Sequence, residues 1–257
     1  MSHPRLPPEF LSIPLAHRGY HDAGLRRPEN SLSAFAAAVA AGYGIELDVQ
    51  RSADGQAMVF HDDTLDRMAE STGAVIARRA AELAHIRLRN SDEHIPLLSE
   101  VLALVAGRVP VLIEIKEHLD TMLQTDGVLE AAVARALKSY AGPVAVMSFN
   151  PHCVAHMARL APDIARGLTT EDYDPANNVP IPADVCARLR DIPDYDATAA
   201  SFLSHKASDL DRPRVFELKQ QGADILCWTI RSAVQEAAAR KIAQNITFEG
   251  YAPAIPA

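Results

Sequence analysis

The sequence predicts an α/β fold, a (β/α)8 barrel of the TIM-barrel class with a small inserted cap, and three observations lead to this prediction. Apolar runs of strand length recur eight times along the 257 residues. Segments with helical periodicity separate most of these runs, an alternation that is typical of a parallel sheet. Eight such units in about 250 residues suit a closed barrel. An open doubly wound sheet is the second candidate, but the first apolar run lacks a glycine-rich dinucleotide-binding turn.

The predicted elements alternate along the whole chain. Strands are predicted at 13–17, 44–49, 109–116, 144–149, 164–168, 200–204, 223–230 and 245–248. Helices are predicted near 32–41, 99–106, 121–139, 151–160, 183–189, 212–221 and 232–241. In the first long helix the apolar residues follow the i, i+3, i+4, i+7 spacing of one helix face. Asn30 or Ser31 can cap its start, and Gly42 suits its end.

Two stretches interrupt this alternation. Residues 51–96 stand between the second strand and its following helix, and they contain a short apolar run at 56–60 within polar sequence. Residues 169–198 are rich in Pro, Asp and Asn. Both follow a strand, and the loops that follow strands form the catalytic face of a barrel. We therefore expect a single catalytic domain over 1–257, with an insertion at about 51–96 that caps the site.

Composition excludes several classes of protein. No run of 18 apolar residues is present, so a soluble globular protein without stable membrane insertion is expected. The net charge of −8 argues against nonspecific binding of nucleic acid. The N-terminal sequence lacks a basic region followed by an apolar one, which favours a cytoplasmic location. Three scattered cysteines suggest neither a disulfide framework nor a zinc site. The oligomeric state is not encoded in any pattern that we recognise.

Polar side chains stand at the ends of the predicted strands. The first strand ends at His17 and Arg18, the second carries Glu46 and Asp48, the third carries Glu114 and Lys116, and the seventh carries Trp228. The carboxyl ends of parallel barrel strands meet at one mouth. The topology therefore predicts three carboxylates, two cations and a histidine in one site.

The carboxylates predict a metal ion. Glu46 and Asp48 are two residues apart on one strand face, with Cα atoms about 6–7 Å apart. Two carboxylates about 5 Å apart at an effective dielectric of about 20 repel each other by roughly 3 kcal/mol. A divalent cation removes that repulsion, and carboxylate oxygens suit Mg²⁺ or Ca²⁺ equally. A cation beside Arg18, Lys116 and a histidine suits a phosphate ester, which needs charge neutralisation and proton transfer.

Several ordered motifs carry a family resemblance. They are His17-Arg18-Gly19, Pro28-Glu29-Asn30, Glu46-x-Asp48, Asp54-Gly55, His61-Asp62, Leu65-x-Arg67, "HIPLLSEVL" at 94–102, "IEIK" at 113–116 and "CWTI" at 227–230. Together they resemble the signature of the glycerophosphodiester phosphodiesterase family over 14–250, closely up to Lys116 and weakly from Phe149 to Leu226. One departure stands at the eighth strand, where many relatives read I-I-T-[DN]-x-P and this chain reads "NITFEGYAP".

The resemblance implies hydrolysis of a small-molecule glycerophosphodiester to glycerol 3-phosphate and an alcohol, within lipid metabolism. It implies Glu46, Asp48 and Glu114 as ligands of one divalent cation, Mg²⁺ or Ca²⁺. It implies His17 and His61 as the acid/base pair, and Arg18 and Lys116 as phosphate-binding residues. Trp228 is a candidate substrate contact.

Several points stay open at this level. We favour His17 as base and His61 as acid, since histidines titrate near neutral pH and one can accept while the other donates a proton. Direct attack by water and attack by a substrate hydroxyl to give a cyclic phosphate both suit these residues. The leaving alcohol is undetermined. Alternatives are a lysophospholipase-D-like activity on lysophospholipids and a non-catalytic phosphodiester-binding module, although no predicted histidine or ligand is missing.

Overall fold

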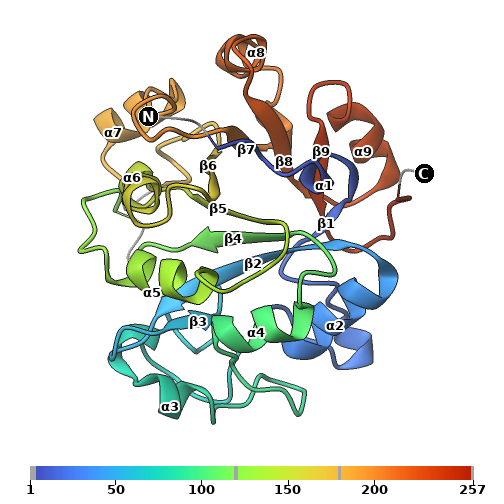
Figure 1. Ribbon diagram of the computed structural model, residues 1–257, viewed down its shortest axis with the longest axis vertical. Coiled ribbons are helices and arrows are strands. Elements are labelled where there is room, and N and C mark those ends of the chain that lie inside the picture. The colour runs from blue at the N-terminus through green and yellow to red at the C-terminus, as the bar shows by residue number, and fades with distance from the viewer. Residues whose placement is uncertain (1–3, 119–120, 179–180, 256–257) are drawn as a thin grey trace.

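Eight parallel strands form a closed barrel in the computed structural model, which describes residues 4–118, 121–178 and 181–255. The strands are β1 (Leu15–Ala16), β2 (Gly44–Arg51), β4 (Val111–Ile115), β5 (Val144–Ser148), β6 (Ala165–Thr170), β7 (Phe202–Lys206), β8 (Asp224–Ile230) and β9 (Asn245–Phe248). Each pairs with its neighbour in sequence order, and β1 pairs with both β2 and β9, which closes the ring. The predicted barrel is confirmed, and the open sheet is excluded (Figure 1).

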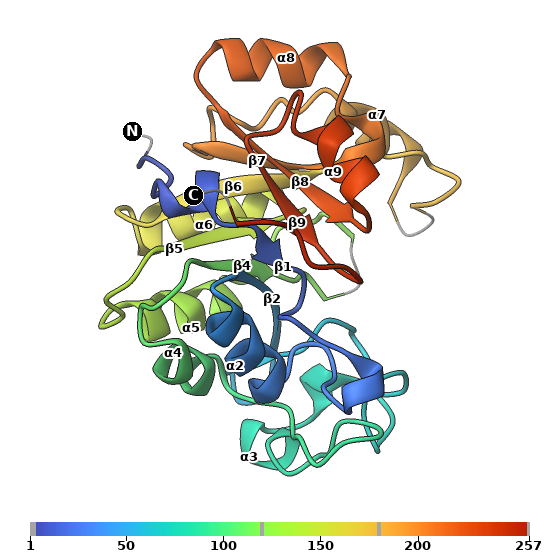
Figure 2. The same ribbon diagram turned by 90° about the vertical axis from the view of Figure 1, so that its right-hand side faces the viewer.

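Helices surround the barrel (Figure 2). They are α1 (Glu9–Ser12), α2 (Leu32–Ala41), α3 (Ala80–Leu83), α4 (Leu98–Val105), α5 (Val128–Leu137), α6 (Pro151–Leu160), α7 (Ala183–Arg190), α8 (Pro213–Gln220) and α9 (Ala233–Ala239). Ser31 caps α2, since its hydroxyl accepts from the N–H of Ala34, and Gly42 ends the helix at φ 77°. No helix in the described ranges has the length and hydrophobicity that crossing a bilayer requires.

One predicted helix is too long. The prediction placed a helix at 121–139, whereas α5 begins at Val128. Gly127 precedes it with φ 76°, outside the helical region, and Thr121 instead bonds to the Glu117 carboxylate. The preceding residues 121–127 therefore form a loop on the catalytic side of the barrel.

One apolar cluster lies between the barrel and its helices, and a second lies inside the barrel. The outward-facing residues of the strands, such as Ile45, Leu47 and Ile113, pack against the helices in one large cluster. A second cluster occupies the barrel interior and contains Leu6, Phe10, Leu15, Leu112, Ala145, Met147, Ala165, Phe202 and Leu226. Leu6 and Phe10 come from α1 and the residues before it. The short helix thus fills the amino-terminal end of the barrel, and the alternate residues of β2 that face the interior are the acids.

The segment between β2 and α4 forms a small unit of its own at the bottom of both ribbon views. It contains β3 (Ala57–Val59), which pairs antiparallel with β2, the 3-10 turn η2 (Val75–Ala77) and α3. Its apolar side chains, including Leu65, Leu83 and Ile95, form a cluster separate from the barrel cores. His61 lies two residues after the end of β3, so the hairpin returns the chain to the mouth of the barrel.

Candidate active site at the mouth of the barrel

A single cavity collects the residues that the sequence singled out. It has a volume of about 60 Å³ and lies at the carboxyl ends of the strands. Its lining consists of His17, Arg18, Glu46, Asp48, His61, Glu114, Lys116, Met147, Phe149, Trp228 and Thr247. All eight residues predicted for the site are among them. The structure therefore brings together side chains from β1, β2, β4 and β8 and from the loop after β3.

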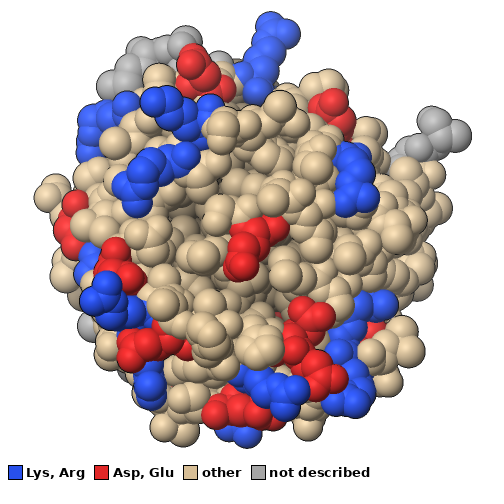
Figure 3. Space-filling model, turned by 60° about the horizontal axis from the view of Figure 1, so that its bottom comes forward, with Lys and Arg blue, Asp and Glu red and all other residues tan. Residues whose placement is uncertain are grey.

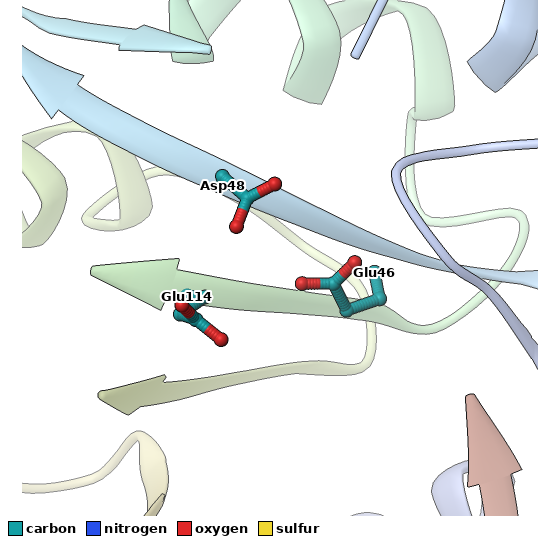
Figure 4. A group of neighbouring side chains, drawn as sticks. All are labelled: Glu46, Asp48 and Glu114. Atoms are coloured by element: carbon teal, nitrogen blue, oxygen red, sulfur yellow. The ribbon is translucent and has the colours of Figure 1, made fainter. Parts of the chain in front are cut away.

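Three carboxylates form the floor of this cavity. Asp48 on β2 lies opposite Glu114 on β4 in the strand register, and Glu46 stands two residues earlier on the same face of β2. One oxygen of each carboxylate lies within 4.8 Å of the others. All three residues are at least 95% buried. Figure 4 shows their side chains directed into the same space between the two strands.

The pKa values of two acids in this cluster, Glu46 and Asp48, are shifted in opposite directions. Burial, together with the charges of Asp48 and Glu114, raises the pKa of Glu46 well above its ordinary value. Burial also disfavours the ionised form of Asp48, but the charges of Lys116, His61 and Arg18 outweigh it and hold the Asp48 pKa below its ordinary value. Lys116 Nζ lies 2.5 Å from Glu114 and 3.2 Å from Asp48. The charges of Lys116 and Arg18 therefore lower the pKa of Asp48 but do not offset the effect of burial on Glu46.

The donor set fits a hard divalent cation. Three carboxylates offer only oxygen atoms, and no thiolate or imidazole from the described residues joins the group. Oxygen ligands of this kind are what Mg²⁺ and Ca²⁺ prefer, whereas structural zinc sites use sulfur and nitrogen.

Arg18 is held in an unusual backbone conformation beside this cluster. Its φ of 54° lies in the left-handed region, and its N–H donates to the Glu46 carboxylate at 2.9 Å. Gly19 follows with φ 81°, and a Cβ there would lie 3.0 Å from side-chain atoms of α2. The tight turn after β1 thus requires glycine, and it aims the Arg18 guanidinium at the cavity.

Three further residues connect Arg18 to His61. His61 Nδ1 lies 2.7 Å from Asp62, and Arg67 donates to both oxygens of Asp62. Arg67 also donates to Glu29, which accepts from Arg18 at 2.8 Å. Glu29 thus lies between two guanidinium groups, and Asp62, which lies between Arg67 and His61, orients the ring of His61.

His17 has a carboxylate partner as well. Its Nδ1 lies 2.5 Å from Glu249, a residue that follows β9. Burial lowers the pKa of His17 even though Glu249 and Asp48 act in the opposite direction. Both histidines therefore present Nε2, rather than Nδ1, as the ring nitrogen without a carboxylate partner.

Asn30 and Trp228 support the site from opposite sides. The Asn30 amide donates to Asp48 at 2.9 Å, so this residue braces a carboxylate and leaves helix capping to Ser31. The Trp228 indole donates to the Ser204 carbonyl at 2.9 Å, and its ring meets Phe149 edge to face with centroids 5.5 Å apart. Trp228 is thereby fixed as a half-buried wall of the cavity.

Sequence reasoning missed the role of Glu249. The stretch Phe248-Glu249-Gly250 stood out only as a departure from the family pattern. Its position directly after the eighth strand was the available signal, since residues there reach the barrel mouth. Arg67 and Asp62 were present in the motifs, but their shared ion pairs depend on the fold of the insertion.

Two larger grooves adjoin the cavity. One, of about 530 Å³, shares Trp228 with the cavity and runs between the loops after β7 and β8. The other, of about 290 Å³, shares Lys116 and runs between the insertion and the loop after β4. Because the central cavity is small, the alcohol part of a diester would have to extend into one of these grooves.

A family model and several known proteins are similar to this chain. The model of the "Glycerophosphoryl diester phosphodiesterase family" matches residues 17–247. The chain is 36% identical over 167 residues to "Uncharacterized protein YqiK" of Bacillus subtilis (strain 168) and 34% identical over 166 residues to a glycerophosphodiester phosphodiesterase of Caldanaerobacter subterraneus. Each of these alignments covers 61% of this chain and 66% of the relative's length.

Solved structures share the whole fold. A phosphodiesterase of Oleispira antarctica, solved in complex with the product sn-glycerol-3-phosphate, superposes with a TM-score of 0.75 at 25% identity, covering 93% of each chain. The structure of a protein from Agrobacterium tumefaciens named "Putative glycerophosphoryl diester phosphodiesterase" superposes with a TM-score of 0.74 at 21% identity, again over 93% of each chain. The similarity thus extends across the barrel and its insertion rather than over one motif.

Proposed function

The chain belongs to the glycerophosphoryl diester phosphodiesterase family, and from that premise we propose that it hydrolyses glycerophosphodiesters to glycerol 3-phosphate and an alcohol. The observation that carries the proposal is the convergence of three carboxylates, two cations and two histidines on one cavity. The glycerol 3-phosphate bound by the similar Oleispira enzyme supports this choice of product.

The carboxylates of Glu46, Asp48 and Glu114 would hold one Mg²⁺ or Ca²⁺. When bound, the ion supplies positive charge that polarises a phosphoryl oxygen. Arg18 and Lys116 supply further positive charge at the cavity, and Glu29, Glu114 and Asp48 fix their positions. Trp228 forms the wall against which the substrate lies.

The two histidines move the protons. His17 is neutral at pH 7 because burial lowers its pKa, so it can accept the proton of the attacking hydroxyl. His61, oriented by Asp62, gives a proton to the departing alkoxide, which is otherwise a poor leaving group. The attacking hydroxyl belongs either to water or to the substrate's own glycerol.

Turnover with and without metal tests this function. A panel of glycerophosphodiesters, assayed for release of glycerol 3-phosphate, should be hydrolysed only until EDTA is added. His17→Ala and His61→Ala should each lower kcat by at least about 100-fold and still bind the ion, since neither is a ligand. The control is His85→Ala, an exposed histidine of the insertion. Near-normal rates in either site variant would refute the pair, and EDTA-resistant turnover would refute the metal assignment.

A second candidate is hydrolysis of lysophospholipids. The groove that shares Trp228 is lined partly by apolar residues, namely Ala207, Leu210, Ile230, Ala239 and Ile242, which could contact an acyl chain. Release of the free headgroup alcohol from lysophospholipids, measured beside the first panel, distinguishes the two substrate classes. Binding without turnover on either panel would point to a phosphodiester-binding module.

A further inference from the structure

Glu249 stands directly opposite His17 because of the way the barrel closes. β1 and β9 are adjacent, with Leu15 paired to Thr247 and Ala16 paired to Phe248. One further residue along each strand brings His17 beside Glu249, although the two are 232 residues apart in sequence. The His17 N–H donates to the Phe248 carbonyl, and the Glu249 N–H donates to the Ile230 carbonyl. Both backbones are therefore fixed before the side chains meet.

The Glu249 carboxylate is held from two sides. Its Oε2 lies 2.5 Å from His17 Nδ1, and its Oε1 accepts from Arg231 Nε at 2.7 Å. His21 Nε2 lies 3.9 Å from the same Oε2. These contacts, with the hydrogen bond from His17 as the largest contribution, lower the pKa of Glu249 far below its ordinary value. An ionised carboxylate only accepts hydrogen bonds, so the hydrogen between the two groups belongs to His17 Nδ1.

We propose that Glu249 is the positioning residue of His17: it accepts the Nδ1 hydrogen, fixes the ring orientation and leaves Nε2 as the proton-accepting nitrogen at the cavity. This inference rests on the proposed function, in which His17 is the base. The free imidazole ring can carry its hydrogen on either nitrogen, and the hydrogen bond of one nitrogen decides the state of the other. Without Glu249, the ring could carry its hydrogen on Nε2 instead. In that form Nε2 is unable to accept a proton from the nucleophile.

The arrangement has a counterpart at the other histidine. His61 Nδ1 faces Asp62, and Asp62 is held by Arg67. His17 Nδ1 faces Glu249, and Glu249 is held by Arg231. Each histidine thus has a carboxylate backed by an arginine. The Asp62 carboxylate comes from the adjacent residue in sequence, whereas the Glu249 carboxylate comes from the tail after β9, where this chain departs from the common family pattern.

Kinetics of Glu249 variants form the first test. Glu249→Ala and Glu249→Gln should each lower kcat by about 10–100-fold, with KM within about twofold and with an unchanged rise in Tm on adding Mg²⁺ or Ca²⁺. Glu249 is only half-buried, so both variants should fold. The matched control is Glu236→Gln, which removes a carboxylate that binds Arg240 and Tyr251 of the same region without touching His17. Equal losses in Glu236→Gln and the Glu249 variants, or no loss in the latter, would overturn the proposal.

The tautomer of His17 gives a second test that needs no turnover. Long-range ¹H–¹⁵N correlations of ¹⁵N-histidine-labelled protein distinguish Nδ1–H from Nε2–H rings, and His17→Ala identifies the His17 signal. The wild type should show Nδ1–H, and Glu249→Ala should shift His17 toward Nε2–H. Asp62→Asn should shift His61 instead. If the wild type hydrolyses no glycerophosphodiester, the proposed function is refuted. The NMR measurement still shows in that case whether Glu249 sets the tautomer of His17. If the His17 tautomer is the same in the wild type and in Glu249→Ala, the proposed role of Glu249 is refuted.

Discussion

At the residue scale, the site is built from acids and bases whose partners control their charge. Asp48 contacts Asn30, Lys116 and Arg18, and these contacts keep it ionised despite its burial. Glu46 accepts a hydrogen bond from the backbone N–H of Arg18, and burial raises its pKa. Adjacent carboxylates on one strand face thus have opposite pKa shifts. Partner geometry, rather than residue type, sets the charge of each acid.

A buried histidine away from the site predicts how stability depends on pH. His205 is fully buried, bonds to Thr170 and Asp209, and has a pKa lowered by burial although Asp209 opposes the shift. In the unfolded chain it takes up a proton near pH 6.5. Below that pH the unfolded state binds more protons than the folded state, so stability falls as pH decreases from about 7 to 5.

The variant His205→Gln tests this dependence. Glutamine can still accept from Thr170 and donate to Asp209, but it does not titrate. The slope of Tm against pH between about 7 and 5 should become shallower in His205→Gln than in the wild type. Exposed His85 provides the control substitution, His85→Gln, which should leave the slope unchanged. Identical slopes in all three proteins would contradict the prediction.

At the element scale, the short helix α1 contributes to the interior core of the barrel. α1 has four residues, yet Phe10 is completely buried among the interior residues of the barrel. The Asn245 amide donates to the Phe10 carbonyl at 2.8 Å and to the Ile13 carbonyl at 2.6 Å. The segment therefore closes the amino-terminal end of the barrel through both apolar and polar contacts with β9.

Removal of the Phe10 side chain from the barrel interior should destabilise the protein. Phe10→Ala leaves a cavity inside the barrel and should lower the free energy of unfolding by about 3–5 kcal/mol, measured by urea denaturation. Phe216→Ala on α8 removes the same side chain from a position that is 41% exposed and should cost less than about 1 kcal/mol. A similar loss in both variants would show that α1 does not fill a barrel core.

The elements also show what sequence patterns can and cannot predict. β2 and β4 were predictable because their outward residues are apolar at every second position, and Asp48 and Glu114 lie on the opposite face. The start of α5 was predicted wrongly because residues 121–126 contain neither proline nor glycine to mark a boundary, whereas the φ of 76° at Gly127 makes the helix begin at Val128. The contact of Glu249 with His17 depends on barrel closure across 232 residues, and no local pattern encodes such a distance.

At the scale of the whole molecule, the net charge and the charges inside the cavity have opposite effects on an anionic ligand. Acidic and basic side chains are interspersed around the edge of the face shown in Figure 3, and an acidic patch lies near its middle among uncharged residues. The net charge of −8 would by itself repel an anionic ester. Attraction must therefore come from the cations inside the cavity, Arg18 and Lys116, and from the ion that the carboxylates would hold.

Metal binding should be visible in the stability of the entire fold. An ion that binds only the folded state stabilises it by about 2.7 kcal/mol at 100 times its Kd. Adding Mg²⁺ or Ca²⁺ to EDTA-treated protein should therefore raise Tm. Glu46→Gln should abolish this response without lowering the Tm of the metal-free protein, since it replaces an acid whose ionisation is opposed by burial and by repulsion from Asp48 and Glu114. A metal-free Glu46→Gln protein that is less stable than the wild type would contradict the repulsion.

The pairing of β1 with β9 also sets the order in which the molecule can be completed during its synthesis. Until β9 emerges, β1 has only β2 beside it, and one edge of the sheet stays open. Contacts this distant in sequence form slowly. The same late segment brings Asn245 to α1 and Glu249 to His17. Closure of the ring, the contacts of Asn245 with α1 and the contact of Glu249 with His17 thus all depend on this one late segment.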